Sequence, residues 1–305
     1  MDYELAIVGG GPAGFTAGIY ATRAGIKAML FDSGVGGGLM AISPEIENYP
    51  GFKSISGMAL SDLMREHVEK YMSINFGERV EKLEVSEDEV KITTSNRDYT
   101  VGAVIIATGT EHRKLGVNGE EKLQGMGVSY CATCDGPFFK GKKVLVVGGG
   151  NSALIEAIAL KNMGMDVTLV HRRDVLRAEE VYEKRANEVG VNILYNTHLD
   201  EIKGENIVES VVLKNTKDGS IKEMEISGVF VSIGEMPQNQ LAKQIGVRLD
   251  DNGYIKTDKN MRTNIKRIYA AGDITGGLRQ IVTACAEGAI AALASTEVLG
   301  KIYPY

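Results

Sequence analysis

Two cysteines stand close together as Cys131-Ala-Thr-Cys134, and an acid, Asp135, follows them directly. Two intervening residues let the sulfurs close a small ring, and a thiol at the start of a helix is more readily deprotonated to the nucleophilic thiolate. A neighbouring carboxyl group could carry the proton that each exchange step requires. The spacing therefore predicts a redox-active dithiol, with Cys131, Cys134 and Asp135 as the catalytic residues.

A metal site is the main alternative use of paired cysteines. A closed structural zinc site needs four ligands. The chain has three cysteines, the third being Cys285, and none of its four histidines follows the pair at zinc-finger spacing. We therefore predict that no metal is bound. Cys285 lies in an alanine-rich segment, where we expect it to be a small core residue.

The composition bounds the class of protein. The 305 residues carry 34 basic and 40 acidic side chains, a formal net charge of −6. This length favours two domains, the acidic balance argues against a nucleic-acid partner, and no apolar run is long enough to predict a membrane span. The acidic start, Met1–Glu4, does not resemble a signal peptide. With so few cysteines, we expect a cytoplasmic protein.

A first glycine-rich turn, Gly9–Gly14, stands between a short apolar strand and a helical pattern, and the next strand ends at Asp32. In such a turn Gly9 permits the sharp bend, Gly11 lets the backbone approach a pyrophosphate, and Gly14 lets the helix pack on the strand. The helix N-terminus offers N–H groups to an anion, and Asp32 can accept hydrogen bonds from a ribose. The pattern predicts a dinucleotide site.

The same pattern returns at Gly148–Ala153, but its second strand ends in His171, Arg172 and Arg173 in place of an acid, with Arg177 further on. A carboxylate there would repel a 2′-phosphate, whereas guanidinium groups bind one with charge-assisted, often bidentate hydrogen bonds. One such bond is worth roughly 1.5–3 kcal/mol, which favours NADPH over NADH by about tenfold or more. The second turn therefore predicts an NADPH site.

These patterns predict an α/β fold of two Rossmann-like, three-layer nucleotide-binding domains, the second inserted into the first. We place the first domain at residues 1–111 and 244–305 and the second at 112–243, with turn-rich linkers at 111–119 and 235–246. Two nucleotide sites and one dithiol indicate an electron relay. A hydride and a disulfide each exchange two electrons, and a flavin can stand between them.

Together the motifs resemble those of low-molecular-weight thioredoxin reductases of the bacterial and archaeal type, over nearly the whole chain. They are Gly9–Gly14, Glu47–Gly51, Ala107–Gly109, Cys131–Gly136, Gly148–Ala153, His171–Arg177, Ala271–Asp273 and Arg279–Gln280. The resemblance implies FAD in the first domain, NADPH in the second, a homodimer, and domains that rotate relative to one another. Hydride would pass from NADPH to FAD and then to the cysteine pair, which would reduce thioredoxin by dithiol exchange.

The resemblance also implies individual roles. Cys134 is the sulfur that faces the flavin C4a, Cys131 attacks the disulfide of thioredoxin, and Asp135 is the matching acid. The implied FAD-binding residues are Gly9, Gly11, Pro12, Ala13, Gly14, Asp32, Asn48, Ala107, Thr108, Gly109, Gly272, Asp273, Arg279 and Gln280. The implied NADPH-binding residues are Gly148, Gly150, Asn151, Ser152, Ala153, His171, Arg172, Arg173 and Arg177.

Three segments depart from the family pattern. Ile155 stands where many members have an acid, Gly36–Leu39 lacks a glutamine found in many members, and Pro237–Asn239 replaces a Pro-Asn pair. A reductase of another small redox protein, glutaredoxin-like or peroxidase-linked, is an alternative interpretation, and Ile155 leaves open a different electron donor. A flavin-containing sensor that does not turn over is a third reading, against which Asp135 and the complete NADPH site argue.

Overall fold

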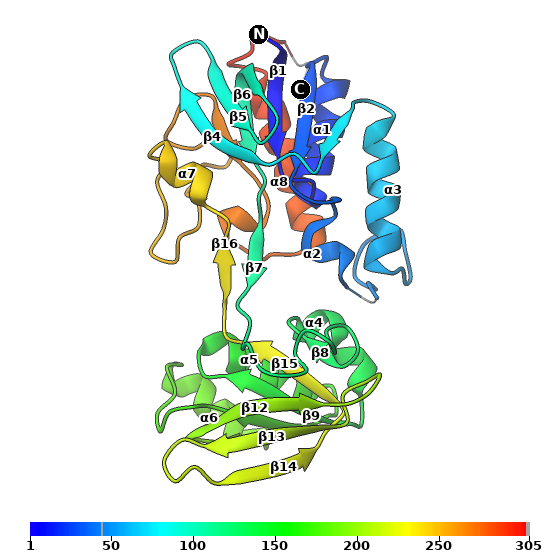
Figure 1. The fold of residues 1–305 in the computed structure, drawn as a ribbon, viewed down its shortest axis with the longest axis vertical. Coiled ribbons are helices and arrows are strands. Elements are labelled where there is room, and N and C mark those ends of the chain that lie inside the picture. The colour runs from blue at the N-terminus through cyan, green and yellow to red at the C-terminus, as the bar shows by residue number, and fades with distance from the viewer. Residues whose placement is uncertain (44, 303–305) are drawn as a thin grey trace. The chain divides into compact units, whose positions relative to one another are not determined.

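The computed structural model describes residues 1–43 and 45–302, and the chain forms two compact units (Figure 1). Unit 1 contains Met1–Glu111 and Met236–Tyr305, and unit 2 contains His112–Glu235. The chain therefore returns to unit 1 earlier than the 243/244 boundary that we expected. The reason is α7 (Gln240–Gln244), which lies in the expected linker but packs on a strand of unit 1 and buries Leu241 in its core.

A seven-stranded sheet forms the centre of unit 1 in the described chain. Its order is β3-β2-β1-β6-β5-β4, with β17 also beside β6. Strands β3, β2, β1, β6 and β17 are parallel, whereas the β4–β5 hairpin continues the sheet in antiparallel pairing. The strands are β1 (Tyr3–Val8), β2 (Ala28–Asp32), β3 (Ile74–Phe76), β4 (Val80–Val85), β5 (Val90–Thr94), β6 (Asp98–Ile106) and β17 (Ile268–Ala270).

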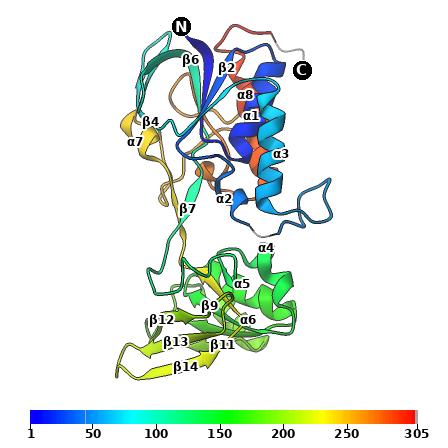
Figure 2. The same ribbon diagram turned by 45° about the vertical axis from the view of Figure 1, so that its right-hand side comes forward.

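Successive side chains of β1 enter two different cores, because neighbouring residues of a strand point to opposite faces of the sheet. Leu5 and Ile7 pack among the helices, and Ala6 and Val8 pack with the β4–β5 hairpin. This gives three layers, in which the helices cover one face of the parallel strands (Figure 2). The helices of unit 1 are α1 (Pro12–Arg23), α2 (Gly38–Ala41), α3 (Gly57–Glu69), α7, the 3₁₀ turn η2 (Asp273–Thr275) and α8 (Ile281–Ser295).

Unit 2 repeats this plan. A parallel sheet of order β11-β10-β9-β15-β8 is accompanied by an antiparallel sheet of order β12-β13-β14. The strands are β8 (Val128–Ser129), β9 (Lys143–Gly148), β10 (Asp166–Val170), β11 (Asn192–Leu194), β12 (Thr197–Lys203), β13 (Ser210–Asn215), β14 (Ile221–Glu225) and β15 (Gly228–Ser232). The helices are α4 (Ala132–Asp135), the 3₁₀ turn η1 (Gly136–Phe139), α5 (Asn151–Asn162) and α6 (Glu180–Glu188).

The alternation seen in β1 recurs in β9. Val144 and Val146 pack with α5 and α6, whereas Leu145 and Val147 pack with β12 and β13. Unit 2 therefore also has three layers, and the prediction of two Rossmann-like α/β units is confirmed. The chain passes between the units in two short strands, β7 (Thr110–His112) and β16 (Glu235–Pro237), which pair with each other.

Candidate functional site

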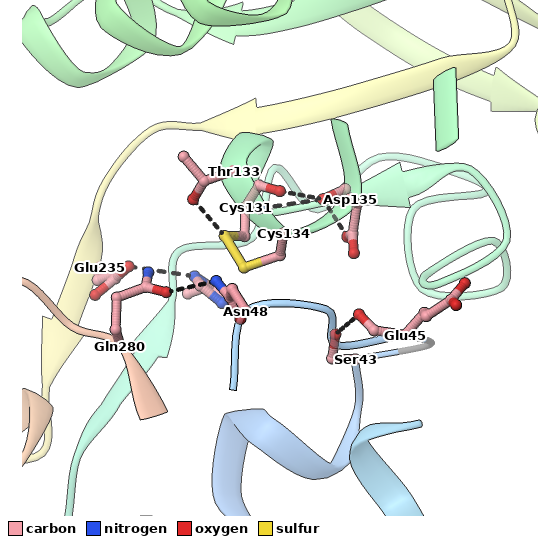
Figure 3. The surroundings of a disulfide bond; sticks show 11 residues. Ser43, Glu45, Asn48, Cys131, Thr133, Cys134, Asp135, Glu235 and Gln280 are labelled. Atoms are coloured by element: carbon pink, nitrogen blue, oxygen red, sulfur yellow. Dashed lines mark hydrogen bonds and ion pairs between the residues drawn. A yellow bond between two sulfur atoms is a disulfide. The ribbon is translucent and has the colours of Figure 1, made fainter. Parts of the chain in front are cut away.

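The redox centre lies at the carboxyl end of β8 in unit 2. Cys131 and Cys134 form a disulfide, with their Cα atoms 5.3 Å apart. Cys131 caps the N-terminus of α4, so the pair sits at a helix start, as the sequence predicts. Figure 3 shows Cys131, Cys134 and Asp135 side by side on this helix, with the Thr133 hydroxyl 3.3 Å from the sulfur of Cys131.

Asp135 is held in place by Ser129, the last residue of β8. The Ser129 hydroxyl donates to Oδ2 of Asp135 at 2.6 Å and accepts from the backbone N–H of Cys131 at 3.1 Å. The other carboxyl oxygen of Asp135 is buried and has no hydrogen-bond partner among the described residues. Burial raises the pKa of Asp135, and the hydrogen bond from Ser129 partly lowers it. The carboxyl is thus suited to take up and release protons beside the disulfide.

The third cysteine has a different environment. Cys285 lies half-buried on α8, with its sulfur 4.0 Å from the Tyr49 hydroxyl. Burial raises the pKa of its thiol, which keeps it protonated and unreactive.

The second glycine turn lies at the same edge of the unit 2 sheet as the disulfide. Strands β8, β15, β9 and β10 are parallel, so Cys131, Gly148 and His171 all lie at the carboxyl ends of strands in one sheet. Ligands of open α/β sheets bind at this edge. Gly148 is close-packed, because a Cβ there would overlap Ser232 and Ala153.

Gly150 contrasts with Gly148. It caps the N-terminus of α5, and a Cβ built on it would meet no described atom within 4 Å. The protein's own packing therefore does not require glycine here, whereas close approach of a phosphate to the backbone does. Asn151, Ser152 and Ala153 form the first turn of α5. The Asn151 amide both donates to and accepts from Glu179, at 2.8 Å in each case.

The basic residues after β10 divide into buried and exposed ones. His171 is 8% exposed, and its ring nitrogens lie 3.1 Å from the Gly148 carbonyl oxygen and 3.0 Å from that of Val175. The buried ring therefore packs against the glycine turn. His171 would contribute to nucleotide binding by holding the backbone of this turn in place. Arg172, Arg173 and Arg177 are exposed and available to an anion.

The first glycine turn, in unit 1, lies at the equivalent edge. Val8 pairs with Phe31 and Ile106, and Ile106 pairs with Ala270. The predicted residues at the carboxyl ends of these four strands are therefore brought together although they are far apart in the chain. They are Gly9, Asp32, Ala107 and Gly272.

The glycines of this turn have different reasons to be glycine. Gly9 has a φ of +113°, which favours glycine. A Cβ at Gly14 would overlap the carbonyl oxygen of Gly9, and one at Gly288 on α8 would overlap that of Ala13. Gly11, which caps α1 ahead of Pro12, has no described atom within 4 Å of its would-be Cβ. The opening at Gly11 fits the pyrophosphate of a dinucleotide.

Asp32 closes the turn from the neighbouring strand. Its carboxyl accepts from the backbone N–H of Gly10 at 2.7 Å and from that of Gly34 at 2.8 Å. Further on, the N–H of Gly37 donates to the carbonyl of Gly10 at 2.7 Å, so the divergent 36–39 segment supports the first turn. A carboxylate has about four acceptor positions, and Asp32 thus retains capacity for a ribose hydroxyl.

The remaining predicted flavin contacts lie in loops of unit 1. Asn48 donates its side-chain amide to Gln280 at 3.1 Å, and Gln280 caps α8 in a capping box with Thr283. Arg279 has a φ of +51° and donates to the Tyr254 hydroxyl at 3.3 Å.

Two further predicted segments flank this region. Thr108 donates to the carbonyl of Gln238 at 2.7 Å, and Gly109 accepts from the N–H of the same residue. Asp273 begins η2 directly after Gly272, and a Cβ at Gly272 would approach Ala13 of the first turn at 2.8 Å.

Three supporting residues were missed by sequence reasoning. Ser129 orients Asp135, Glu179 holds Asn151, and Glu287 accepts from the Gly272 N–H at 2.8 Å and from the Thr275 hydroxyl at 2.9 Å. Glu287 carries a weak signal, because it is an acid inside an otherwise small and apolar helix. Ser129 and Glu179 carry no spacing signal.

Neither a metal site nor a membrane span is found in the described ranges. No cluster of three or more potential ligand side chains occurs within residues 1–43 and 45–302. Over the same ranges, no helix is both long enough and apolar enough to cross a bilayer.

Comparisons with known proteins give relatives over nearly the whole chain. The model of the pyridine nucleotide-disulphide oxidoreductase family matches residues 3–288. Thioredoxin reductase of Bacillus subtilis (strain 168) is 44% identical over 294 residues, which cover 95% of this chain and 92% of the relative. The crystal structure of thioredoxin reductase from Streptococcus pyogenes MGAS5005 has a TM-score of 0.93 at 41% identity and covers 98% of this chain and 99% of that one. The Lactococcus lactis thioredoxin reductase in its FR conformation, also 41% identical, has a TM-score of 0.67 and covers 98% of this chain and 100% of that one.

Proposed function

The chain belongs to the pyridine nucleotide-disulphide oxidoreductase family, and from this premise we propose that it is an NADPH-dependent, FAD-containing thioredoxin-disulfide reductase. The net reaction is NADPH + H⁺ + oxidised thioredoxin → NADP⁺ + reduced thioredoxin. Two electrons leave the nicotinamide as hydride and finally break the disulfide of thioredoxin, whose sulfurs take up two protons. The observation that carries the proposal is the Cys131–Cys134 disulfide beside Asp135, at the ligand-binding edge of a nucleotide-binding sheet.

FAD is the group that we place in unit 1. When bound, it accepts hydride from the nicotinamide and passes the electron pair to a disulfide. The open cradle at Gly11 and the α1 N-terminus would hold the pyrophosphate, and Asp32 would hold a ribose hydroxyl. The Asn48–Gln280 pair and the Gly272–Asp273 turn would hold the remainder of the cofactor.

NADPH is the nucleotide that we place in unit 2. Gly150 at the α5 N-terminus would receive the pyrophosphate, and three exposed arginines would bind the 2′-phosphate. Those arginines are Arg172, Arg173 and Arg177. A guanidinium group is always protonated and binds a phosphate strongly. Because NADH lacks the 2′-phosphate, the site discriminates against it.

The dithiol performs the exchange with thioredoxin. The Cys131 thiolate attacks one sulfur of the thioredoxin disulfide, which forms an intermolecular disulfide and releases a thioredoxin thiolate. Cys134 then attacks the sulfur of Cys131, which restores the Cys131–Cys134 disulfide and releases the second thiolate. Asp135 supplies and removes protons in these steps, because its carboxyl lies beside the pair and burial raises its pKa.

Three further features complete the proposal. The units rotate about the two short strands β7 and β16, because the nicotinamide and the dithiol are both carried by unit 2 and need the same cofactor in turn. The protein is a homodimer that uses unit 1, where Tyr20 on α1 and Val282 and Ile290 on α8 expose apolar surface. The protein works in the cytoplasm.

An anaerobic titration tests the proposal. Purified protein is expected to be yellow, to be bleached by NADPH far more readily than by NADH, and to be reoxidised by thioredoxin. Cys131→Ser is expected to be bleached by NADPH but to reduce no thioredoxin, whereas Cys285→Ser, which alters a residue outside the relay, retains full activity. A colourless protein without FAD, or thioredoxin reduction by Cys131→Ser, would refute the proposal.

A further inference from the structure

The tip of the β13–β14 hairpin is joined to the arginine loop that follows β10 in unit 2. The Thr216 hydroxyl donates to the carbonyl of Arg172 at 3.2 Å. The Thr216 N–H donates to the carbonyl of Asn196 at 2.7 Å, and the Asn196 N–H donates to the carbonyl of Arg173 at 2.9 Å. The hairpin tip is therefore connected, directly or through one residue, to the backbone of both adjacent arginines.

Hydrogen bonds within the hairpin tip fix its backbone conformation. The Asn215 side chain accepts from the N–H of Lys217 at 2.8 Å and from that of Asp218 at 3.3 Å. The N–H of Gly219, whose φ is +73°, donates to the carbonyl of Asn215 at 3.1 Å. These bonds fix the backbone from which Lys217 extends, so the lysine is displayed from a positioned turn.

Lys217 places a further cation beside the arginine loop. Its ammonium nitrogen lies 3.8 Å from a carboxyl oxygen of Asp174, the residue that follows Arg173. The two side chains are 65% and 67% exposed. An ion pair this exposed contributes little, and the flexible lysine stem can exchange one anion for a stronger one.

We propose that Lys217 is a specificity-determining residue of the nucleotide site: its ammonium binds the 2′-phosphate together with the three arginines. Without nucleotide the ammonium pairs with Asp174, which therefore competes with the 2′-phosphate for Lys217. This inference rests on the proposed use of NADPH by unit 2. It extends the site beyond the segments that follow the glycine turn, to a hairpin in the antiparallel layer. A phosphate ester carries more negative charge than a carboxylate at neutral pH, so Lys217 turns from Asp174 to the nucleotide.

Two nucleotide fragments test the inference without turnover. Isothermal titration of the FAD-loaded enzyme compares adenosine 2′,5′-bisphosphate, which carries the 2′-phosphate, with adenosine 5′-monophosphate, which lacks it. Lys217→Met is expected to weaken binding of the bisphosphate by about fivefold or more and to leave the monophosphate unchanged. Lys217→Arg retains tight binding. Lys222→Met, which removes an exposed lysine of the same hairpin on β14, is the matched control and retains wild-type affinity.

Asp174→Asn gives an independent prediction of opposite sign. Removing the competing anion is expected to tighten binding of the bisphosphate by about twofold, and this gain should disappear when Lys217→Met is added. A tightening that persists in the double variant would show that Asp174 acts on the nucleotide directly and would overturn its assigned competition with Lys217.

The outcomes separate the inference from the proposed function. If the wild-type enzyme binds the two fragments equally well, the NADPH site of the proposed function is wrong. If the wild-type enzyme prefers the bisphosphate and Lys217→Met keeps the full preference, the role of Lys217 is overturned while the proposed function stands. An equal loss in Lys222→Met would show a general charge effect and would also overturn the role.

Discussion

The Ser129 hydroxyl lies 2.6 Å from Oδ2 of Asp135, and both residues flank the disulfide, one before Cys131 and one after Cys134. The same hydroxyl receives the N–H of Cys131. Ser129 therefore connects the attacking cysteine to the acid that serves it, and its hydrogen bond partly opposes the effect of burial on the pKa of that acid. Two predictions concern this pair.

Ser129→Ala is expected to move the pH dependence of thioredoxin reduction. The hydrogen bond from Ser129 lowers the pKa of Asp135, against the larger effect of burial, which raises it. Removing the hydroxyl leaves burial unopposed, so the pKa rises further and the limb of the kcat profile that reports Asp135 moves to higher pH. Ser227→Ala, at the opposite edge of the unit 2 sheet, is the control. An unchanged limb would remove Ser129 from the proton pathway.

Asp135→Asn is expected to change how stability depends on pH. A buried carboxyl whose folded-state pKa is raised stabilises the fold below its unfolded pKa, about 3.9. That stability is lost as the pH rises through the higher folded value. The variant does not titrate at this position, so its Tm relative to wild type should increase as the pH rises above about 4. The variant should also reduce thioredoxin more slowly than wild type, because asparagine cannot take up and release the proton. A difference in Tm that is constant over this range would contradict the buried, raised carboxyl.

Much of the site was predictable because its chemistry lies in short segments. The Cys131–Cys134 pair depends on the spacing of two side chains, and each glycine turn depends on one strand and one helix. The parallel sheet then brings together strand ends from distant parts of the chain, such as Gly9 and Gly272, because ligands of open α/β sheets meet at the carboxyl edge. The local sequence motifs, together with the rule that ligands bind at the carboxyl edge of such sheets, were sufficient to predict which segments lie at each site.

The features that sequence reasoning missed depend on contacts between remote residues. Glu287 reaches Gly272 only because α8 packs beside the first turn, and Lys217 reaches Asp174 only because the β13–β14 hairpin returns to the arginine loop. The return of the chain to unit 1 at Met236, earlier than the expected 243/244 boundary, has a similar cause. The polar, turn-rich composition of 235–246 indicates a linker, but Leu241 is buried in unit 1. Tertiary packing decided these cases.

Gly11→Ala and Gly14→Ala are expected to separate cofactor binding from folding. Alanine at Gly11 meets no described atom within 4 Å, whereas alanine at Gly14 overlaps the carbonyl oxygen of Gly9. Urea unfolding of flavin-free Gly11→Ala should therefore give a free energy within about 1 kcal/mol of wild type, while the variant purifies colourless. Gly14→Ala should lose about 1–3 kcal/mol or more even without flavin. Full flavin binding by Gly11→Ala would show that the cradle holds no pyrophosphate.

Replacing Arg172, Arg173 and Arg177 together by alanine is expected to convert the nucleotide preference. The three side chains are exposed and extend from the loop after β10, so their removal leaves the core of unit 2 intact. Loss of charge-assisted bonds to the 2′-phosphate should raise KM for NADPH by about 10- to 100-fold, with KM for NADH nearly unchanged. Arg185→Ala, which removes an exposed charge from α6, is the control. Steady-state kinetics with both nucleotides decides the matter, because a site that reads the 2′-phosphate must lose NADPH selectively. An equal rise in both KM values would mean that the arginines act on the fold or on the shared part of the nucleotide.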